Sequence, residues 1–182
     1  MSTSLGAVYL ESAIKRFLTY KVLGDMTFAQ LEEKDFYYAP PGESSNSIAV
    51  IIQHMHGNMK SRWTNFLTED GEKPGRNRDE EFGEPHTGKD QLLALWEKGW
   101  ACLLDTLRSL TEEDLLKTIT IRHEPLLAVD AINRQLAHYP HHVGQIVYIG
   151  KMIRGAAWQS LSISKGASEA FNQFMQDKHA RR

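Results

Sequence analysis

Apolar residues recur at intervals of three and four positions along four long stretches of the chain, a period typical of helices with one buried face. The expected helices span residues 4–31, 47–67, 89–110 and 129–154. The third has the cleanest apolar stripe, formed by Leu92, Trp96, Trp100, Leu103, Leu107 and Leu110. Four such helices in 182 residues predict an all-α protein, a four-helix bundle built as a single domain over residues 1–182.

The segments between the helices differ in character. Residues 35–45 contain Pro40-Pro41-Gly42, which indicates a loop, and Asn46 or Ser47 then offers an N-cap. Residues 68–89 are charged, rich in turn residues and without period, so we expect a long ordered loop with internal salt bridges and a functional role. Residues 118–122 alternate β-branched side chains, which predicts a short extended stretch that ends at Pro125.

Two features modify the helices, and a tail follows them. Gly24 is expected to bend the first helix, and Pro140 is expected to kink the fourth because it lacks an N–H and clashes with the carbonyl of Leu136. The tail is turn-rich over residues 160–168 and helical over residues 169–176.

Composition excludes several classes of function. The apolar share is 41%, the charged share 24% and the net charge −2, so nothing favours nucleic acid or an anionic membrane as a partner. No apolar run approaches the roughly 18 residues that a membrane span needs. Cys102 is the single cysteine, which excludes an intramolecular disulfide and favours the cytoplasm. Residues 1–5 lack the charged start and apolar core of a signal peptide.

The eight histidines are the unusual part of the composition. His138 and His142 are four residues apart, so on a helix they share one face and could hold one metal ion. His54 lies on the flank of the apolar stripe of the second helix and is the best third ligand. Three histidines with an open fourth position are typical of a catalytic metal site, and imidazole suits zinc, nickel, iron and copper.

Two groups of motifs extend this interpretation. The fourth helix carries His138-x-x-His141-His142-x-Gly144-Gln145, and this motif, with His54, resembles the DinB-like (YfiT-type) superfamily of metal-binding four-helix bundles. Residues 54–82 and 161–172 are similar to one uncharacterised branch of it.

The resemblance implies that His54, His138 and His142 bind a divalent metal ion, which we expect to be zinc or nickel. It also implies a homodimer. Some members of the superfamily are thiol S-transferases, which activate a small-molecule thiol on the metal and transfer it to an electrophile. The branch itself has no activity that can be carried over to this chain.

Three functions therefore stay open: a metal-dependent thiol S-transferase, a non-catalytic metal-binding stress or sensor protein, and a metal-dependent hydrolase. A fourth protein ligand would favour the sensor, and a carboxylate within reach of the metal would favour the hydrolase. Asn58 and Gln145 are candidates for hydrogen bonds to the ligands, with ordinary packing as the alternative.

Other residues have a structural interpretation first. His141 is expected at the surface, His56 in packing, and Cys102 as a small buried apolar residue. Three arginines could gather an anionic cosubstrate, although salt bridges with Asp70, Asp79 or Glu81 are the simpler expectation. These arginines are Arg62, Arg76 and Arg78.

Overall fold

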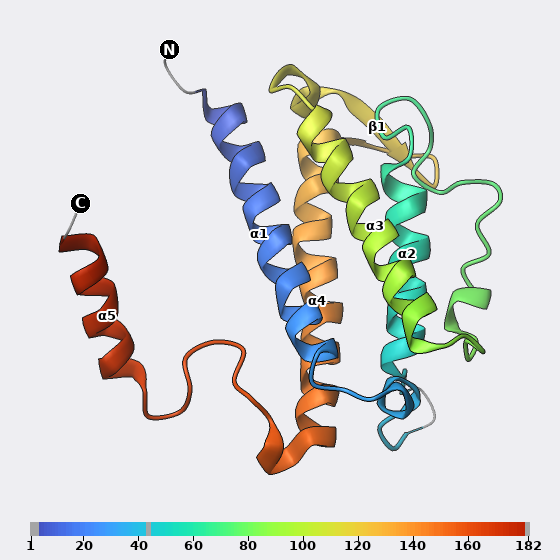
Figure 1. The fold of residues 1–182 in the computed structure, drawn as a ribbon. Helices are drawn as coiled ribbons and strands as arrows, with labels where there is room; N and C mark the ends of the chain where they lie inside the picture. The colour runs from blue at the N-terminus through green and yellow to red at the C-terminus, as the bar shows by residue number, and fades with distance from the viewer. Residues whose placement is uncertain (1–3, 43–44, 181–182) are drawn as a thin grey trace.

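A computed structural model describes residues 4–42 and 45–180, and it is predominantly helical (Figure 1). Its α-helices are α1 (Leu5–Phe28), α2 (Ile48–Trp63), α3 (Lys89–Ser109), α4 (Ala128–Arg154) and α5 (Ser168–Ala180). Its 3-10 helices are η1 (Glu33–Tyr37), η2 (Glu80–Phe82), η3 (Glu113–Leu116) and η4 (Gly155–Ala157). The expected all-α class is confirmed, with α1 to α4 at the four expected places. Residues 1–3, residues 43–44 of the expected loop and residues 181–182 lie outside the described part.

The four long helices pack side by side around one apolar core (Figure 1). Helix α2 contacts α3 and α4, and α1 contacts the same two helices, so α3 and α4 each lie between the other pair. Helix α5 contributes no buried residue and stands apart from the others in Figure 1. The contact between α2 and α4 is the one that matters for the site.

The core is built from the apolar stripes that the sequence predicts. Trp63 of α2, Trp100 of α3 and Tyr139 of α4 are fully buried, and Phe17 of α1 packs against the last two rings. Helix α2 begins where expected, because the Ser47 hydroxyl accepts a hydrogen bond from the Val50 N–H.

Gly24 and Pro140 both lie inside uninterrupted helices. A Cβ at Gly24 would collide with the indole of Trp96, so this glycine allows α1 and α3 to approach closely. Helix α4 continues through Pro140 from Ala128 to Arg154, and the histidines on either side of the proline stay together.

The extended stretch before α4 is longer than predicted. Strand β1 (Thr118–Ile121) pairs antiparallel with β2 (Glu124–Leu127), so the expectation that Pro125 ends the extended segment is wrong. Pro125 lies opposite Thr120, next to the closing pair of a two-residue turn. At that position of an antiparallel ladder the N–H points away from the partner strand, so proline removes no hydrogen bond.

A helix that spans a membrane is both long and apolar. Within residues 4–42 and 45–180, none of the helices combines the length and the apolar character required for a membrane span.

Candidate metal site

Three histidines from two helices meet at the interface of α2 and α4. His54 comes from α2, and His138 and His142 come from successive turns of α4. Each ring offers one nitrogen as a ligand, and these nitrogens all lie within 4.8 Å of one another. Among the described residues, this is the group of histidine, cysteine and carboxylate side chains arranged to hold a metal ion.

Each of the three rings is held by a hydrogen bond at its Nδ1 atom. His54 Nδ1 lies 3.0 Å from Glu81 Oε2, His138 Nδ1 lies 3.0 Å from Gln135 Oε1, and His142 Nδ1 lies 2.8 Å from Gln145 Oε1. Oxygen atoms of this kind accept, so each Nδ1 carries the proton and donates it. Each Nε2 atom is therefore left with its lone pair available as a metal ligand.

The Nε2 atoms of His138 and His142 lie 3.1 Å apart, although both present a lone pair. Two lone pairs at this distance repel each other unless a cation lies between them. Burial, followed by the neighbouring histidines, lowers the pKa of His138 to about 3. Burial is also the main reason that the pKa of His142 falls to about 4. Both rings are therefore neutral at pH 7, and a metal ion held between the two nitrogens would relieve this repulsion.

The donor set fits a transition metal. Two nitrogen ligands about 2.0–2.1 Å from a tetrahedral zinc ion lie roughly 3.3–3.4 Å apart, close to the separation of His138 and His142. Neutral imidazole is a good ligand for zinc and nickel and a poor one for magnesium or calcium. The described residues place no fourth histidine, cysteine or carboxylate in the group.

Glu81 is the residue at this site that the sequence did not single out as a neighbour of the histidines. It lies in η2, inside the long charged loop, and only 7% of its surface is exposed. Arg76 holds both of its oxygens, with Nε 2.7 Å from Oε1 and Nη2 2.7 Å from Oε2. Burial alone would raise the pKa of Glu81, but the hydrogen bonds from Arg76 and His54 outweigh burial and hold its pKa below the usual value. The carboxylate is therefore ionised at neutral pH.

Gly57 explains how Glu81 reaches α2. A Cβ at position 57 would lie 2.6 Å from the Glu81 carboxyl carbon, which is closer than nonbonded atoms approach. Because glycine has no side chain, the loop can place a carboxylate against the helix one turn after His54.

Of the two residues proposed to hydrogen-bond the ligands, Gln145 does so and Asn58 does not. Gln145 contacts His142 as described above, from one turn further along α4. Asn58 makes no hydrogen bond to any of the three histidines among the described residues; its amide oxygen accepts one of 2.9 Å from the Tyr139 hydroxyl. Tyr139 in turn accepts one of 3.0 Å from Trp63 Nε1, so Asn58 ends a buried chain of hydrogen bonds.

The other candidates lie outside the group. His141 is exposed, and His56 lies against Gly99 of α3, as expected for a packing residue. Cys102 is partly buried on α3 with its sulfur near the Met59 carbonyl. Neither His56 nor Cys102 contacts the three histidines.

A polar cavity of about 340 Å³ opens beside the three histidines. Five arginines line it, together with Asn58, Phe82 and Gln135, and its lining contains no carboxylate. These arginines are Arg62, Arg76, Arg78, Arg122 and Arg134. A small molecule could therefore reach the Nε2 face of the site.

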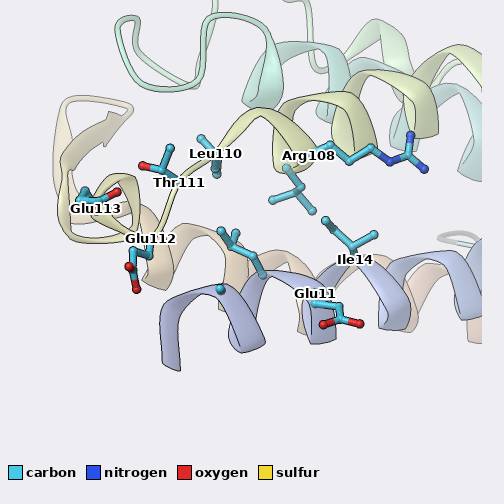
Figure 2. Close-up of a pocket in the computed structure, with 10 residues that line it drawn as sticks. Glu11, Ile14, Arg108, Leu110, Thr111, Glu112 and Glu113 are labelled. Carbon is cyan, nitrogen blue, oxygen red and sulfur yellow. The ribbon is translucent and has the colours of Figure 1, made fainter. Parts of the chain in front are cut away.

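A larger hollow of about 520 Å³ lies elsewhere, between α1 and the end of α3 (Figure 2). Figure 2 shows Ile14 and Leu110 beside it, with Glu11, Glu112 and Glu113 near its rim. It contains no histidine or cysteine, and none of its residues belongs to the group arranged to hold a metal ion among the described residues. The smaller cavity is therefore the candidate site.

Comparison with known proteins gives a family but no function. No curated protein and no solved structure matches this sequence. The model of the family described as "Protein of unknown function (DUF1572)" matches residues 4–167, which include α1 to α4, the charged loop and all three histidines. The match ends just before α5. The chain belongs to the DUF1572 family.

Proposed function

We propose that this protein is a four-helix bundle of the DinB-like superfamily that binds one divalent metal ion through His54, His138 and His142, and that it transfers a small-molecule thiol to an electrophile. The observation that carries the proposal is the convergence of the three rings, each with its Nδ1 atom already occupied by a hydrogen bond. We expect zinc or nickel as the metal.

A metal ion in this position supplies Lewis acidity, which lowers the pKa of a thiol or water molecule that approaches it. The protein residues supply the rest. Glu81, Gln135 and Gln145 orient the three rings and hold their tautomers. The cavity beside the rings admits the substrate, and the ionised Glu81 balances part of the charge of a bound cation.

Two features favour a thiol transferase over the sensor and the hydrolase. A sensor or storage site is usually closed by a fourth protein ligand, and the described residues bring only three ligands together beside an open cavity. A free carboxylate beside the metal would favour a hydrolase, because it could act as the general base for a water molecule. Both oxygens of Glu81 are occupied by Arg76 and His54, and the residues that line the cavity include no carboxylate.

Metal analysis of the purified protein tests the site directly. We expect about one equivalent of metal in the wild type, and a loss of most of it in His138→Ala, with an unchanged helical circular dichroism spectrum. His141→Ala is the matched control, because it removes an exposed histidine from the same helix and should keep the metal. Stoichiometric metal in His138→Ala would count against the proposal.

A thiol-transfer assay then tests the reaction. The metal-loaded protein is incubated with a small-molecule thiol and an electrophile that releases a chromophore, and turnover should disappear in His138→Ala. A metal-loaded protein that binds no thiol would leave the sensor as the better proposal. The proposed homodimer, which rests on the superfamily resemblance, is tested by sedimentation of the same preparations.

A further inference from the structure

We propose that the cavity beside the histidines is an anion-binding site, in which Arg78, Arg122 and Arg134 bind a carboxylate or phosphate group of the substrate. The proposal rests on the proposed function for the identity of the site, and it adds the chemical class of the molecule that enters. It concerns arginines that come from three separate segments: the charged loop, the turn between β1 and β2, and α4.

The five arginines of the cavity fall into two groups. Arg62 and Arg76 are largely shielded from solvent and are neutralised by glutamates: Arg62 pairs with Glu72 at 2.9 Å, and Arg76 pairs with Glu81 at 2.7 Å. These two arginines form the walls of the site. Arg78, Arg122 and Arg134 are exposed at its edge.

The three exposed arginines carry excess positive charge. Among the described residues, neither Arg78 nor Arg134 has a carboxylate within 4.0 Å. Arg122 has one contact, 3.1 Å to Glu72 Oε2, and this same oxygen already serves Arg62 and Arg76. Five guanidinium groups therefore share two carboxylates, in a protein whose net charge is −2. Positive charge concentrated in a concave site attracts anions and raises their local concentration.

Arg122 is held in a strained backbone conformation. It occupies the first position of the β1–β2 turn with a φ of 54°, and His123 follows with a φ of 64°. Such turns strongly favour Asn-Gly, because other residues are strained at positive φ. Asp70 offsets the strain by accepting hydrogen bonds of 2.8 Å from the backbone N–H of both residues. A residue kept at a strained position beside a cavity is a reason to look for a function.

Arg78 and Arg134 are each placed on the same side of the fold as a histidine of the triad. The guanidinium of Arg78 lies 4.9 Å above the ring of Phe82, and that ring stacks on His54 with centroids 4.7 Å apart. Arg134 precedes His138 by four residues on α4, so the two side chains share one face of the helix. An anion that contacts these arginines therefore has the rest of its structure close to the Nε2 atoms.

The size and shape of the site define the ligand further. A cavity of about 340 Å³ is at the small end of the range for ligand pockets, roughly 300–1,000 Å³, which suits a small metabolite. Arginine binds planar and tetrahedral oxyanions through paired N–H groups, so a carboxylate and a phosphate are both suitable. The geometry therefore points to a small anion, and under the proposed function this anion is a thiol.

The test compares two thiols of similar size by isothermal titration calorimetry with the metal-loaded protein. Mercaptosuccinate carries two carboxylates, and 1-thioglycerol carries none. We expect the wild type to prefer mercaptosuccinate by at least about tenfold, the lower end of the value of a hydrogen bond between charged groups. The preference should shrink as the salt concentration rises, because the arginines are exposed.

The variant Arg122→Gln/Arg134→Gln should lose this preference while it keeps stoichiometric metal and its helical spectrum. Arg16→Gln is the matched control, since Arg16 is an exposed arginine on α1 outside the cavity. Equal affinity of the wild type for both thiols, or a preference that survives in the double variant, would overturn the proposal.

A second arm separates this proposal from the metal site. Succinate and inorganic phosphate are titrated into His138→Ala, which should lack metal but keep all five arginines. We expect at least one of the two anions to bind, and the one that binds shows whether a carboxylate or a phosphate is preferred. Adding Arg122→Gln/Arg134→Gln to this variant should weaken the binding at least about tenfold. If the wild type holds no metal, the proposed function fails, and this arm still decides the anion site. Absence of binding by both anions would reject it.

Discussion

Glu81 Oε2 lies 3.0 Å from Nδ1 of His54, and this contact makes the long charged loop a part of the candidate metal site. The loop reaches α2 because position 57 is a glycine, and Arg76 holds the carboxylate from the far side. Of the salt bridges expected for the three arginines, the one between Arg76 and Glu81 is present, and it orients a histidine of the triad. Arg62 pairs with Glu72 instead, and Arg78 has no carboxylate within 4.0 Å among the described residues. The loop therefore sets the position of the first ligand as well as one wall of the cavity.

Glu81→Gln should weaken metal binding without abolishing it. The amide can still accept a hydrogen bond from His54, but it removes the negative charge and places an N–H₂ group against Arg76. We expect the metal affinity to fall by about 10- to 100-fold, the usual effect of losing a group that orients a ligand. Competition with a chromophoric chelator measures the affinity. Glu80→Gln removes an exposed neighbouring charge and should change nothing; equal affinities in the two variants would show that Glu81 plays no part.

Gly57→Ala should disturb the contact between Glu81 and His54 from the α2 side. The new Cβ displaces the Glu81 carboxylate from its contacts with Arg76 and His54. We expect a lower free energy of unfolding and a weaker metal affinity. Gly144→Ala is the control: nothing lies within 4 Å of the added Cβ on this exposed helical position, so alanine should stabilise α4 by up to about 1 kcal/mol. Chemical denaturation compares the two, and a stabilised Gly57→Ala would contradict the proposed packing.

The sequence predicted the helices well, because apolar residues recur with helical period in each of α1 to α4, most regularly in α3. The same period placed His138 and His142 on one face of α4, and Gln145 one turn beyond them. Glu81 could not be found in this way. It lies in a segment without period, and its contact with His54 spans 27 positions that follow no regular structure.

The β1–β2 turn shows another limit of the pattern. The sequence Arg122-His123 lacks the Asn-Gly signal of a two-residue hairpin, and Pro125 suggested the end of the strand. The turn forms because Asp70, about 50 positions earlier, accepts its two backbone N–H groups. A backbone conformation fixed by a distant side chain leaves no local trace in the sequence.

Tyr139→Phe tests the buried hydrogen bonds behind the site. The Tyr139 hydroxyl links Trp63 Nε1 to the amide oxygen of Asn58, and its removal leaves both of these buried groups without their partner. We expect a loss of about 1–3 kcal/mol in the free energy of unfolding. Tyr148→Phe removes a hydroxyl from an exposed tyrosine of the same helix and should be neutral. A Tyr139→Phe variant as stable as the wild type would show that water replaces the hydroxyl.

The metal-free protein should lose stability on acidification from pH 7 to pH 5. The pKa is about 3 for His138 and about 4 for His142 in the folded protein, against about 6.5 in an unfolded chain. Between these values the unfolded state binds more protons, so the free energy of unfolding falls as the pH falls. Each ring contributes at most about 2 kcal/mol over this range, because pH 5 lies about 1.5 units below the pKa of an unfolded histidine. Solvent in the cavity reduces the contribution below this limit.

Urea denaturation of protein stripped with a chelator, at pH 7, 6 and 5, measures this dependence. His138→Gln/His142→Gln removes the two rings whose pKa is lowered most and should make the curve shallower over this window. His56, whose pKa is also lowered by burial, keeps part of the slope. His141→Gln, which leaves the triad intact, should keep the slope of the wild type. An equally steep curve for the double variant would mean that groups outside the triad govern the acid sensitivity, and that the two rings are less shielded from water than their positions indicate.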